Sequence, residues 1–207
     1  MNKKGFIARA AVGAIGGALL IGGAGAAIAD ELGDQDVDVN VNIEALPPVG
    51  ALTLSVANGS TSLTEVPSTD EEIRQFNGQL PTVTVKDDRE EVPAGVFWYV
   101  TGQSSALTAT GGHSIDAGHI GWLPKLVTST GNGEVAEGEQ VDTVLDQGPD
   151  AVGLVGDELL ALSLDSGEAA SVGTWQAGAD LFLKTPKSVA PGAYSGTITL
   201  TLWEDAQ

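Results

Sequence analysis

Apolar and polar residues alternate with a period of two along most of the 207-residue chain. The clearest example is residues 36–43, where Val37, Val39, Val41 and Ile43 alternate with aspartate and asparagine. Such alternation is typical of a β-strand with one buried and one solvated face. No stretch shows the sustained spacing of an amphipathic helix. The pattern therefore predicts an all-β protein.

Turn residues divide the rest of the chain into short segments with the same alternation. The predicted strands cover residues 51–57, 60–66, 80–86, 96–101, 126–130, 139–145, 159–164, 177–184 and 194–203. Together with residues 36–43 they make about ten short strands without alternating helices. This arrangement predicts a single antiparallel β-sandwich, either immunoglobulin-like or jelly-roll-like.

Two segments near the N-terminus carry more specific signals. Asn58-Gly59 is a dipeptide that favours a type I′ turn, so we expect residues 51–57 and 60–66 to form a hairpin. Residues 69–72 have the spacing of a capping box. They are compatible with one helical turn ending at Asn77-Gly78 and equally with a surface loop.

Residues 96–101 (VFWYVT) carry large apolar side chains on both faces, unlike the other predicted strands. Such a strand belongs in the middle of a core, so we expect Trp98 at the centre of the sandwich. A glycine-rich stretch follows and leads to Trp122, which lies two residues before Pro124. Because proline cannot donate a ladder hydrogen bond, we expect Trp122 at a strand edge or in a loop.

The first 29 residues have the pattern of an export signal. Three basic residues precede an uncharged run over residues 10–29, which ends in an A-x-A cleavage pattern. A retained membrane anchor is the rival interpretation, but six glycines in the run disfavour a spanning helix. We therefore expect a signal peptide over residues 1–29 and a secreted domain over residues 30–207.

The chain is strongly acidic, with 28 aspartate and glutamate residues against nine lysine and arginine residues. Three of those bases lie in the predicted signal peptide, so the secreted domain has six bases against 28 acids, a formal charge of −22. Nucleic acid and anionic membranes are poor partners for such a charge. The absence of cysteine excludes disulfides, thiolate metal sites and a cysteine nucleophile.

One loop offers candidate chemistry, because His113, Asp116 and His119 lie close together in the sequence. A catalytic triad or a zinc site needs further groups converging on a rigid frame, so a solvated loop is the simpler interpretation. Three alternating aspartates within residues 34–38 could attract Ca²⁺, but they lack the glycine and the bidentate glutamate of a loop-type calcium site. We therefore expect no metal, no cofactor and no catalytic residue.

Several short motifs, in a particular order, resemble a known family. Residues 191–202 (PGAYSGTITLTL) combine a tyrosine with an alternating strand, and residues 98–101 (WYVT) are similar to a W-x-L element. Residues 83–89 and 121–125 fall where proteins of this type carry similar segments. Over residues 37–202 the chain thus resembles the WxL-domain surface proteins of Gram-positive bacteria.

This resemblance implies an exported β-rich domain that is held non-covalently at the cell wall through peptidoglycan, often beside partner surface proteins. The chain departs from the motif at two positions. Val100 stands where the first element has leucine, and Leu200 stands where the distal element has tryptophan, with Trp203 three residues later. We expect mainly structural roles for the motif residues Trp98, Val100, Tyr194, Leu200 and Leu202.

A Gram-positive wall is itself polyanionic, so a domain of charge −22 must bind it through short-range contacts such as aromatic stacking. Trp122, near a proline, and Trp203, on the polar face of the last strand, are the candidate contacts. The leading hypothesis is a non-enzymatic surface protein associated with the wall. One alternative is a subunit of an extracellular fibre or matrix, for which residues 36–42 could supply an exchanged strand. A second alternative is a secreted hydrolase that uses the His113 loop.

Overall fold

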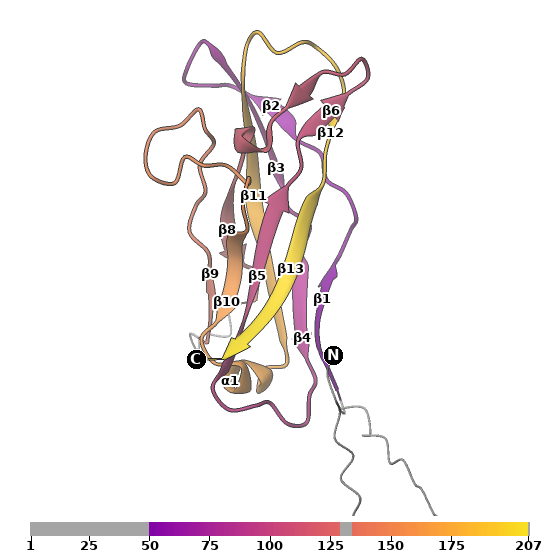
Figure 1. Cartoon of the computed structure of the whole chain (residues 1–207), viewed down its shortest axis with the longest axis vertical. Coiled ribbons are helices and arrows are strands. Elements are labelled where there is room, and N and C mark those ends of the chain that lie inside the picture. Colours follow the sequence, from indigo (N-terminus) through magenta and orange to yellow (C-terminus); the bar gives the residue numbers. More distant parts are fainter. Residues whose placement is uncertain (1–49, 129–133, 207) are drawn as a thin grey trace, which may run out of the picture. The chain divides into compact units, whose positions relative to one another are not determined.

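Two antiparallel β-sheets pack against each other in the computed structural model, which describes residues 50–128 and 134–206 (Figure 1). Strands account for about half of the described residues, and the helical segments among them are short. The prediction of an all-β, antiparallel sandwich is therefore confirmed. The predicted signal peptide and the predicted strand over residues 36–43 lie outside the described residues.

The large sheet has six strands and is built around β11. Its strands are β1 (Leu52–Val56), β2 (Thr64–Val66), β3 (Ile73–Gln79), β4 (Val83–Asp87), β8 (Ile120–Leu126) and β11 (Thr174–Pro186). The second sheet has the order β13-β5-β10-β9. Its strands are β5 (Val96–Ser104), β9 (Val135–Glu137), β10 (Glu158–Ser163) and β13 (Ile198–Ala206).

A small third sheet and two short helical segments complete the described part of the chain. The third sheet comprises β6 (Leu107–Ala109), β7 (Ser114–Ile115) and β12 (Tyr194–Ser195). The helical segments are the 3-10 helix η1 (Ala117–His119) and the helix α1 (Ser166–Ala170). Within the described ranges, no helix is both long and apolar enough to cross a membrane.

Successive halves of β11 pair with β3 and β4, which act as one interrupted strand. β3 pairs antiparallel with residues 180–186 of β11, and β4 pairs with residues 174–177. The interruption is short, because the amide of Leu80 still donates to the carbonyl of Ala179 at 2.8 Å. β2 and β1 pair in the same order with β3 and β4 and form the outer edge of this sheet.

The predicted hairpin around Asn58-Gly59 is wrong, since β1 pairs with β4 and β2 pairs with β3. The chain advances eight residues from Val56 to Thr64, while its partner covers six from Asn77 to Val83. The dipeptide therefore lies in a bulged interruption of one edge strand. Its local turn preference is overridden because β3 and β4 have their register fixed by pairing with the buried β11.

Other local predictions also need correction. Residues 73–79 form β3, not a helical turn or a surface loop. The strand predicted over residues 126–130 was placed too late, because β8 ends at Leu126. Residues 139–145 contribute only isolated bridges. The connection after the predicted strand over residues 159–164 contains α1, which begins with the Asp165 carboxylate accepting a hydrogen bond from the Glu168 amide at 3.0 Å.

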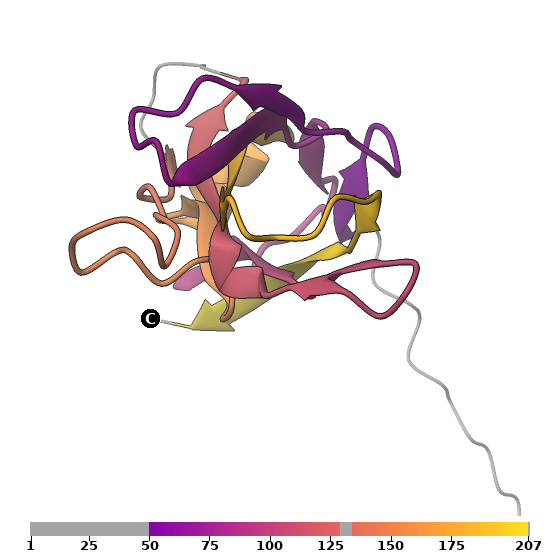
Figure 2. The same ribbon diagram turned by 90° about the horizontal axis from the view of Figure 1, so that it is seen from above.

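The core lies between the two sheets and confirms the predicted central position of Trp98. Trp98 is 1% exposed on the inner face of β5 and belongs to the same buried cluster as Leu160 of β10. Val83 and Leu181 bring the large sheet into this cluster. Seen along the long axis (Figure 2), the strands coloured indigo and purple and the yellow β13 lie in different layers.

An arginine clasp, which we define as Asp87, Arg89 and Glu204, connects the two sheets. The guanidinium of Arg89 donates to both oxygens of Asp87, at 2.9 and 2.7 Å, and to both oxygens of Glu204, at 3.0 and 2.8 Å. The Arg89 and Asp87 side chains are only 14% and 3% exposed. Asp87 ends β4 and Glu204 lies in β13, so the clasp ties one sheet to the other.

Candidate functional site

Trp122 is fully buried, so the prediction of an exposed wall contact at this residue is wrong. It lies within β8, where Ile120, Trp122 and Pro124 face inward and Leu123 faces solvent. The Trp122 amide donates to the carbonyl of Val141, on the side away from β11. The backbone nitrogen of Pro124, two residues later, is on the same side of the strand, away from β11. The N–H that proline lacks would therefore not have bonded to β11.

The space for the Trp122 indole comes from a glycine on the opposite sheet. A Cβ atom at Gly102 of β5 would lie 2.6 Å from Cη2 of Trp122. The ring therefore fills the layer between β8 and β5, a pairing that sequence spacing could not show. Trp122 contributes to packing and is not available to a ligand in the folded protein.

Trp203 is exposed, as predicted, and belongs to an aromatic strip on the outer face of the second sheet. We define the aromatic strip as Phe97, Tyr99 and Trp203. The rings of Tyr99 and Trp203 are 6.3 Å apart between centroids and inclined by 18°, and those of Phe97 and Tyr99 are 5.9 Å apart and inclined by 24°. Trp203 is 43% exposed, whereas Phe97 and Tyr99 are half-buried.

The strands hold this strip in a fixed arrangement. β13 pairs with β5 so that Trp203 lies opposite Tyr99 and Thr201 lies opposite Thr101. The indole Nε1 of Trp203 donates to the hydroxyl of Thr101 at 3.0 Å, which orients the ring across the sheet. Aromatic faces beside hydroxyl groups suit a ligand that has both apolar faces and polar edges. The strip can therefore stack on a neutral polar ligand without using charge.

The other motif residues point mainly to the interior. Trp98 and Val100 are 1% exposed and act through packing. Leu200 and Leu202 of β13 are half-buried against the core. The hydroxyl of Tyr194 donates to the carbonyl of Ala190 at 2.8 Å, which fastens the chain just before the last strand. The mainly structural roles expected for these motif residues stay a prediction.

The polar side chains of the histidine loop face solvent or make structural hydrogen bonds. His113 and Asp116 are exposed, and the Asp116 carboxylate accepts a hydrogen bond from the Gly118 amide at 3.0 Å as the cap of η1. Nδ1 of His119 lies 2.7 Å from the carbonyl oxygen of Lys184, so this nitrogen carries the proton and donates it to that bond. Within residues 50–128 and 134–206, no group of three or more histidine and acidic side chains could hold a metal ion.

Lys184 itself takes part in a partly buried polar contact that the sequence did not reveal. Its ammonium group pairs with the carboxylate of Asp146, which also accepts hydrogen bonds from the amide and hydroxyl of Thr143 at 3.0 and 2.8 Å. Burial alone would raise the pKa of Asp146, but the bonds from Lys184 and Thr143 outweigh it and lower that pKa. The contact holds the loop at residues 143–146 against β11.

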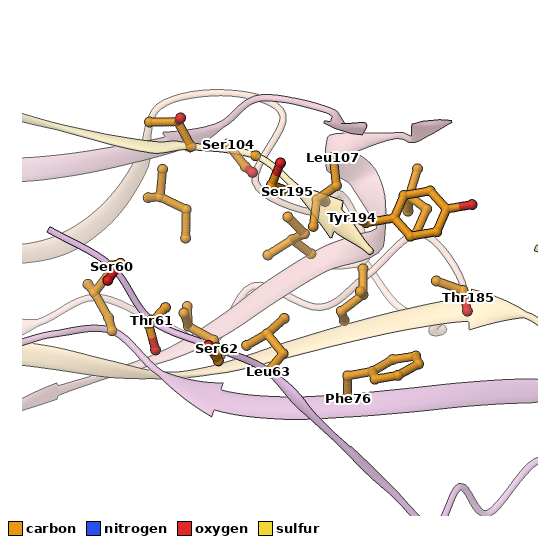
Figure 3. Close-up of a pocket in the computed structure, with 18 of the residues that line it drawn as sticks. Ser60, Thr61, Ser62, Leu63, Phe76, Ser104, Leu107, Thr185, Tyr194 and Ser195 are labelled. Atoms are coloured by element: carbon orange, nitrogen blue, oxygen red, sulfur yellow. The ribbon is translucent and has the colours of Figure 1, made fainter. Parts of the chain in front are cut away.

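A groove of about 920 Å³ opens between the two sheets at the end where β2, β6 and β12 lie (Figures 1 and 3). In the close-up, residues 60–63 and Phe76 lie on one side of the groove, and Leu107, Tyr194 and Ser195 lie on the other. Sequence reasoning missed it because its lining comes from segments far apart in the chain. No single motif marks such a site.

The comparisons with known proteins give no family assignment. No family model matches the chain, and no curated protein matches it. One similar solved structure is a family 123 glycoside hydrolase from Clostridium perfringens, studied for glycolipid glycan hydrolysis, with a TM-score of 0.31 and 18% identity. The match covers 62% of this chain and 18% of the hydrolase chain. A likeness this partial carries no argument about activity.

Proposed function

We propose that this protein is an exported, non-enzymatic surface protein that associates non-covalently with the peptidoglycan of a Gram-positive cell wall through the aromatic strip. The observation that supports this proposal best is the exposure of Trp203 beside Tyr99 and Phe97 on the outer sheet face. The resemblance of residues 37–202 to WxL-domain proteins points to the same ligand. Partner surface proteins at the wall are part of this proposal.

The charge of the domain dictates how such binding must work. A domain of charge −22 is repelled by the polyanionic wall over distances up to the Debye length, about 8 Å at physiological salt. Stacking of an indole on a sugar ring acts only at contact and does not need charge. Retention on walls should therefore hold or increase as salt rises, the reverse of the behaviour of a basic wall binder.

The test is a pair of alanine substitutions at matched exposed positions. Trp203→Ala removes the most exposed ring of the strip, while Leu123→Ala removes an apolar side chain of similar exposure, 42%, on β8 of the other sheet. Trp203→Ala should lower retention on washed cell walls at least about tenfold, since truncation of an interface tryptophan commonly costs about 2 kcal/mol or more. Leu123→Ala should sediment with walls as the parent does.

The melting curve of Leu123→Ala should stay close to that of the parent, because exposed side chains contribute little to stability. Trp203→Ala should remain folded but melt somewhat lower, because it removes the ring contact with Tyr99 and the hydrogen bond to Thr101. A folded Trp203→Ala protein that sediments with walls as well as the parent would exclude the strip as the site. Export is tested separately, because intact mass of the secreted protein should place the N-terminus at Asp30. An intact Met1 in a membrane fraction would show a retained anchor instead.

A further inference from the structure

The groove has an apolar interior in a chain that is otherwise rich in acids. Side chains from both main sheets and from the small sheet converge in it, including Leu63, Phe76, Leu107, Ile115, Leu183 and Ile198. Among the described residues that line it, Arg74 is the one charged side chain, and none is aspartate or glutamate. The whole chain has 28 acids. Acidic side chains are thus absent from the described lining of the groove, although they are frequent in the rest of the chain.

The groove is bounded by sheet edges that offer free backbone groups. β13 is the terminal strand of its sheet, and β1 and β2 end the large sheet, so each has one edge without a strand partner in the described residues. Ile198 and Leu200 of β13 and the bulged residues 58–63 all line the groove. Exposed edges of this kind pair readily with an added strand. The cavity, about 920 Å³, is at the upper end of the size of ligand pockets, about 300–1,000 Å³.

An occupant that fits these features is an extended peptide with apolar side chains on one side only. Main-chain hydrogen bonds to a sheet edge supply affinity in such complexes, and pockets for alternate side chains supply specificity. Residues 36–43 of this chain have that chemistry, because three valines and Ile43 alternate with aspartate and asparagine. The apolar side would enter the groove, and the polar side would remain in water.

The position of the chain's entry into the sandwich favours a second copy as the donor. Gly50 and Ala51 are fixed at Asp88, where the amide of Ala51 donates to the carboxylate at 2.7 Å, and β1 then runs toward the groove at Val56 (Figure 1). Seven peptide steps separate Ile43 from Gly50, a reach of about 24 Å at most. The six steps from Gly50 to Val56 already cover about 20 Å.

Insertion within the same chain would thus need a reversal at Gly50 and a linker stretched to nearly its full length. A segment from another molecule needs neither the reversal nor the stretched linker. We propose that the groove binds residues 36–43 of a second copy of this chain as an added β-strand. Because donor and acceptor surfaces differ, the contact is heterologous and propagates head-to-tail into chains or rings. This inference is independent of wall binding, since the aromatic strip lies on the outer face of the sheet and does not line the groove.

The first experiment compares substitutions on the two sides of the donor segment in the processed protein, residues 30–207. Val39→Asp with Val41→Asp adds two charges on the apolar side, whereas Asn40→Asp with Asn42→Asp adds the same charges on the polar side. Sedimentation velocity should show concentration-dependent assembly for the parent and for the asparagine variant. The valine variant should stay monomeric, with association weakened at least about tenfold for each valine.

The second experiment tests the acceptor. Leu107→Glu places a charge in the groove, and Ser62→Trp fills it with bulk, so one variant remains informative if the other fails to fold by its melting curve. Each acceptor variant should be monomeric alone and form a one-to-one dimer, without longer chains, when mixed with the valine variant. A synthetic peptide of residues 34–45 should bind the valine variant saturably and should not bind either acceptor variant.

Three results would overturn the proposal. The parent could remain monomeric at all concentrations, as it would if its own segment filled the groove. The asparagine variant could lose assembly together with the valine variant, which would indicate a general charge effect. The peptide could bind Ser62→Trp and the parent equally, which would place the contact elsewhere. Retention of the Trp203→Ala protein on cell walls tests only the wall-binding proposal, and self-assembly tests only the strand-addition proposal. Either proposal can therefore fail without the other.

Discussion

Replacement of Arg89 by leucine should reveal how much the arginine clasp stabilises the sandwich. In the folded protein Arg89 makes charge-assisted hydrogen bonds to Asp87 of β4 and to Glu204 of β13. Leucine keeps much of the apolar stem but removes every donor. The Asp87 carboxylate, which is 3% exposed, would then remain buried without its counter-charge.

The magnitude follows from this burial. Loss of one partner of a buried ion pair typically costs about 3–5 kcal/mol, because the other charge is left uncompensated. A domain of this size has a total stability of about 5–15 kcal/mol, so Arg89→Leu should remove a large part of it. Glu204→Gln should cost less, since the Glu204 side chain is 28% exposed and water can replace part of its contact.

The pKa of Asp87 determines the pH range in which the arginine clasp stabilises the folded protein. Burial by itself raises the pKa of Asp87, but the hydrogen bonds and charge of Arg89 outweigh it and hold this pKa below its usual value. A group with a lowered pKa in the folded state stabilises the fold above its unfolded pKa, about 3.9 for aspartate. That contribution is lost as pH falls through the folded pKa of Asp87.

The assay is urea unfolding of the parent, Arg89→Leu and an Asp87→Asn, Arg89→Leu double variant between about pH 7 and pH 3, a range that spans the ordinary aspartate pKa. We expect a gap of about 3–5 kcal/mol between parent and single variant near neutral pH, which narrows below about pH 4. The double variant should recover part of the loss because it removes the stranded charge. Equal unfolding free energies for parent and Arg89→Leu, or a gap that does not change with pH, would refute the reasoning.

Two further predictions concern the interior. Trp122→Ala should cost about 3–5 kcal/mol in unfolding free energy, as large aromatic truncations in cores do, whereas Trp122→Phe should cost less because the indole Nε1 has no hydrogen-bond partner among the described residues. Equal melting temperatures for Trp122→Ala and the parent would place this ring at the surface. Asp146→Asn should destabilise the protein near neutral pH and progressively less below about pH 4, because the lowered pKa of Asp146 stabilises the fold only while the carboxylate is ionised. A chemical denaturation series across that range checks the trend, and a constant difference would contradict it.

The wrong prediction of an exposed Trp122 shows which information the sequence alone does not contain. Pro124 correctly indicated a position without a ladder bond, but an edge strand can still turn its side chains into the core. The indole is buried because Gly102, twenty residues earlier on the opposite sheet, leaves room for it. In the same way, Asn58-Gly59 has a local preference for a hairpin turn. The hairpin does not form, because β1 and β2 pair instead with the two parts of an interrupted partner strand.

Period-two alternation by itself determined the fold class, the central strand with Trp98 and the outward face of Trp203, because each depends only on which side of a strand a residue takes. Tertiary structure alone decided which strands are neighbours, and this decided the sites. The aromatic strip exists because β13 aligns Trp203 with Tyr99, and the groove exists because β2, β12 and β13 leave open edges around a shared apolar space. These contacts join residues about a hundred positions apart, and short-range patterns contain no information on long-range register.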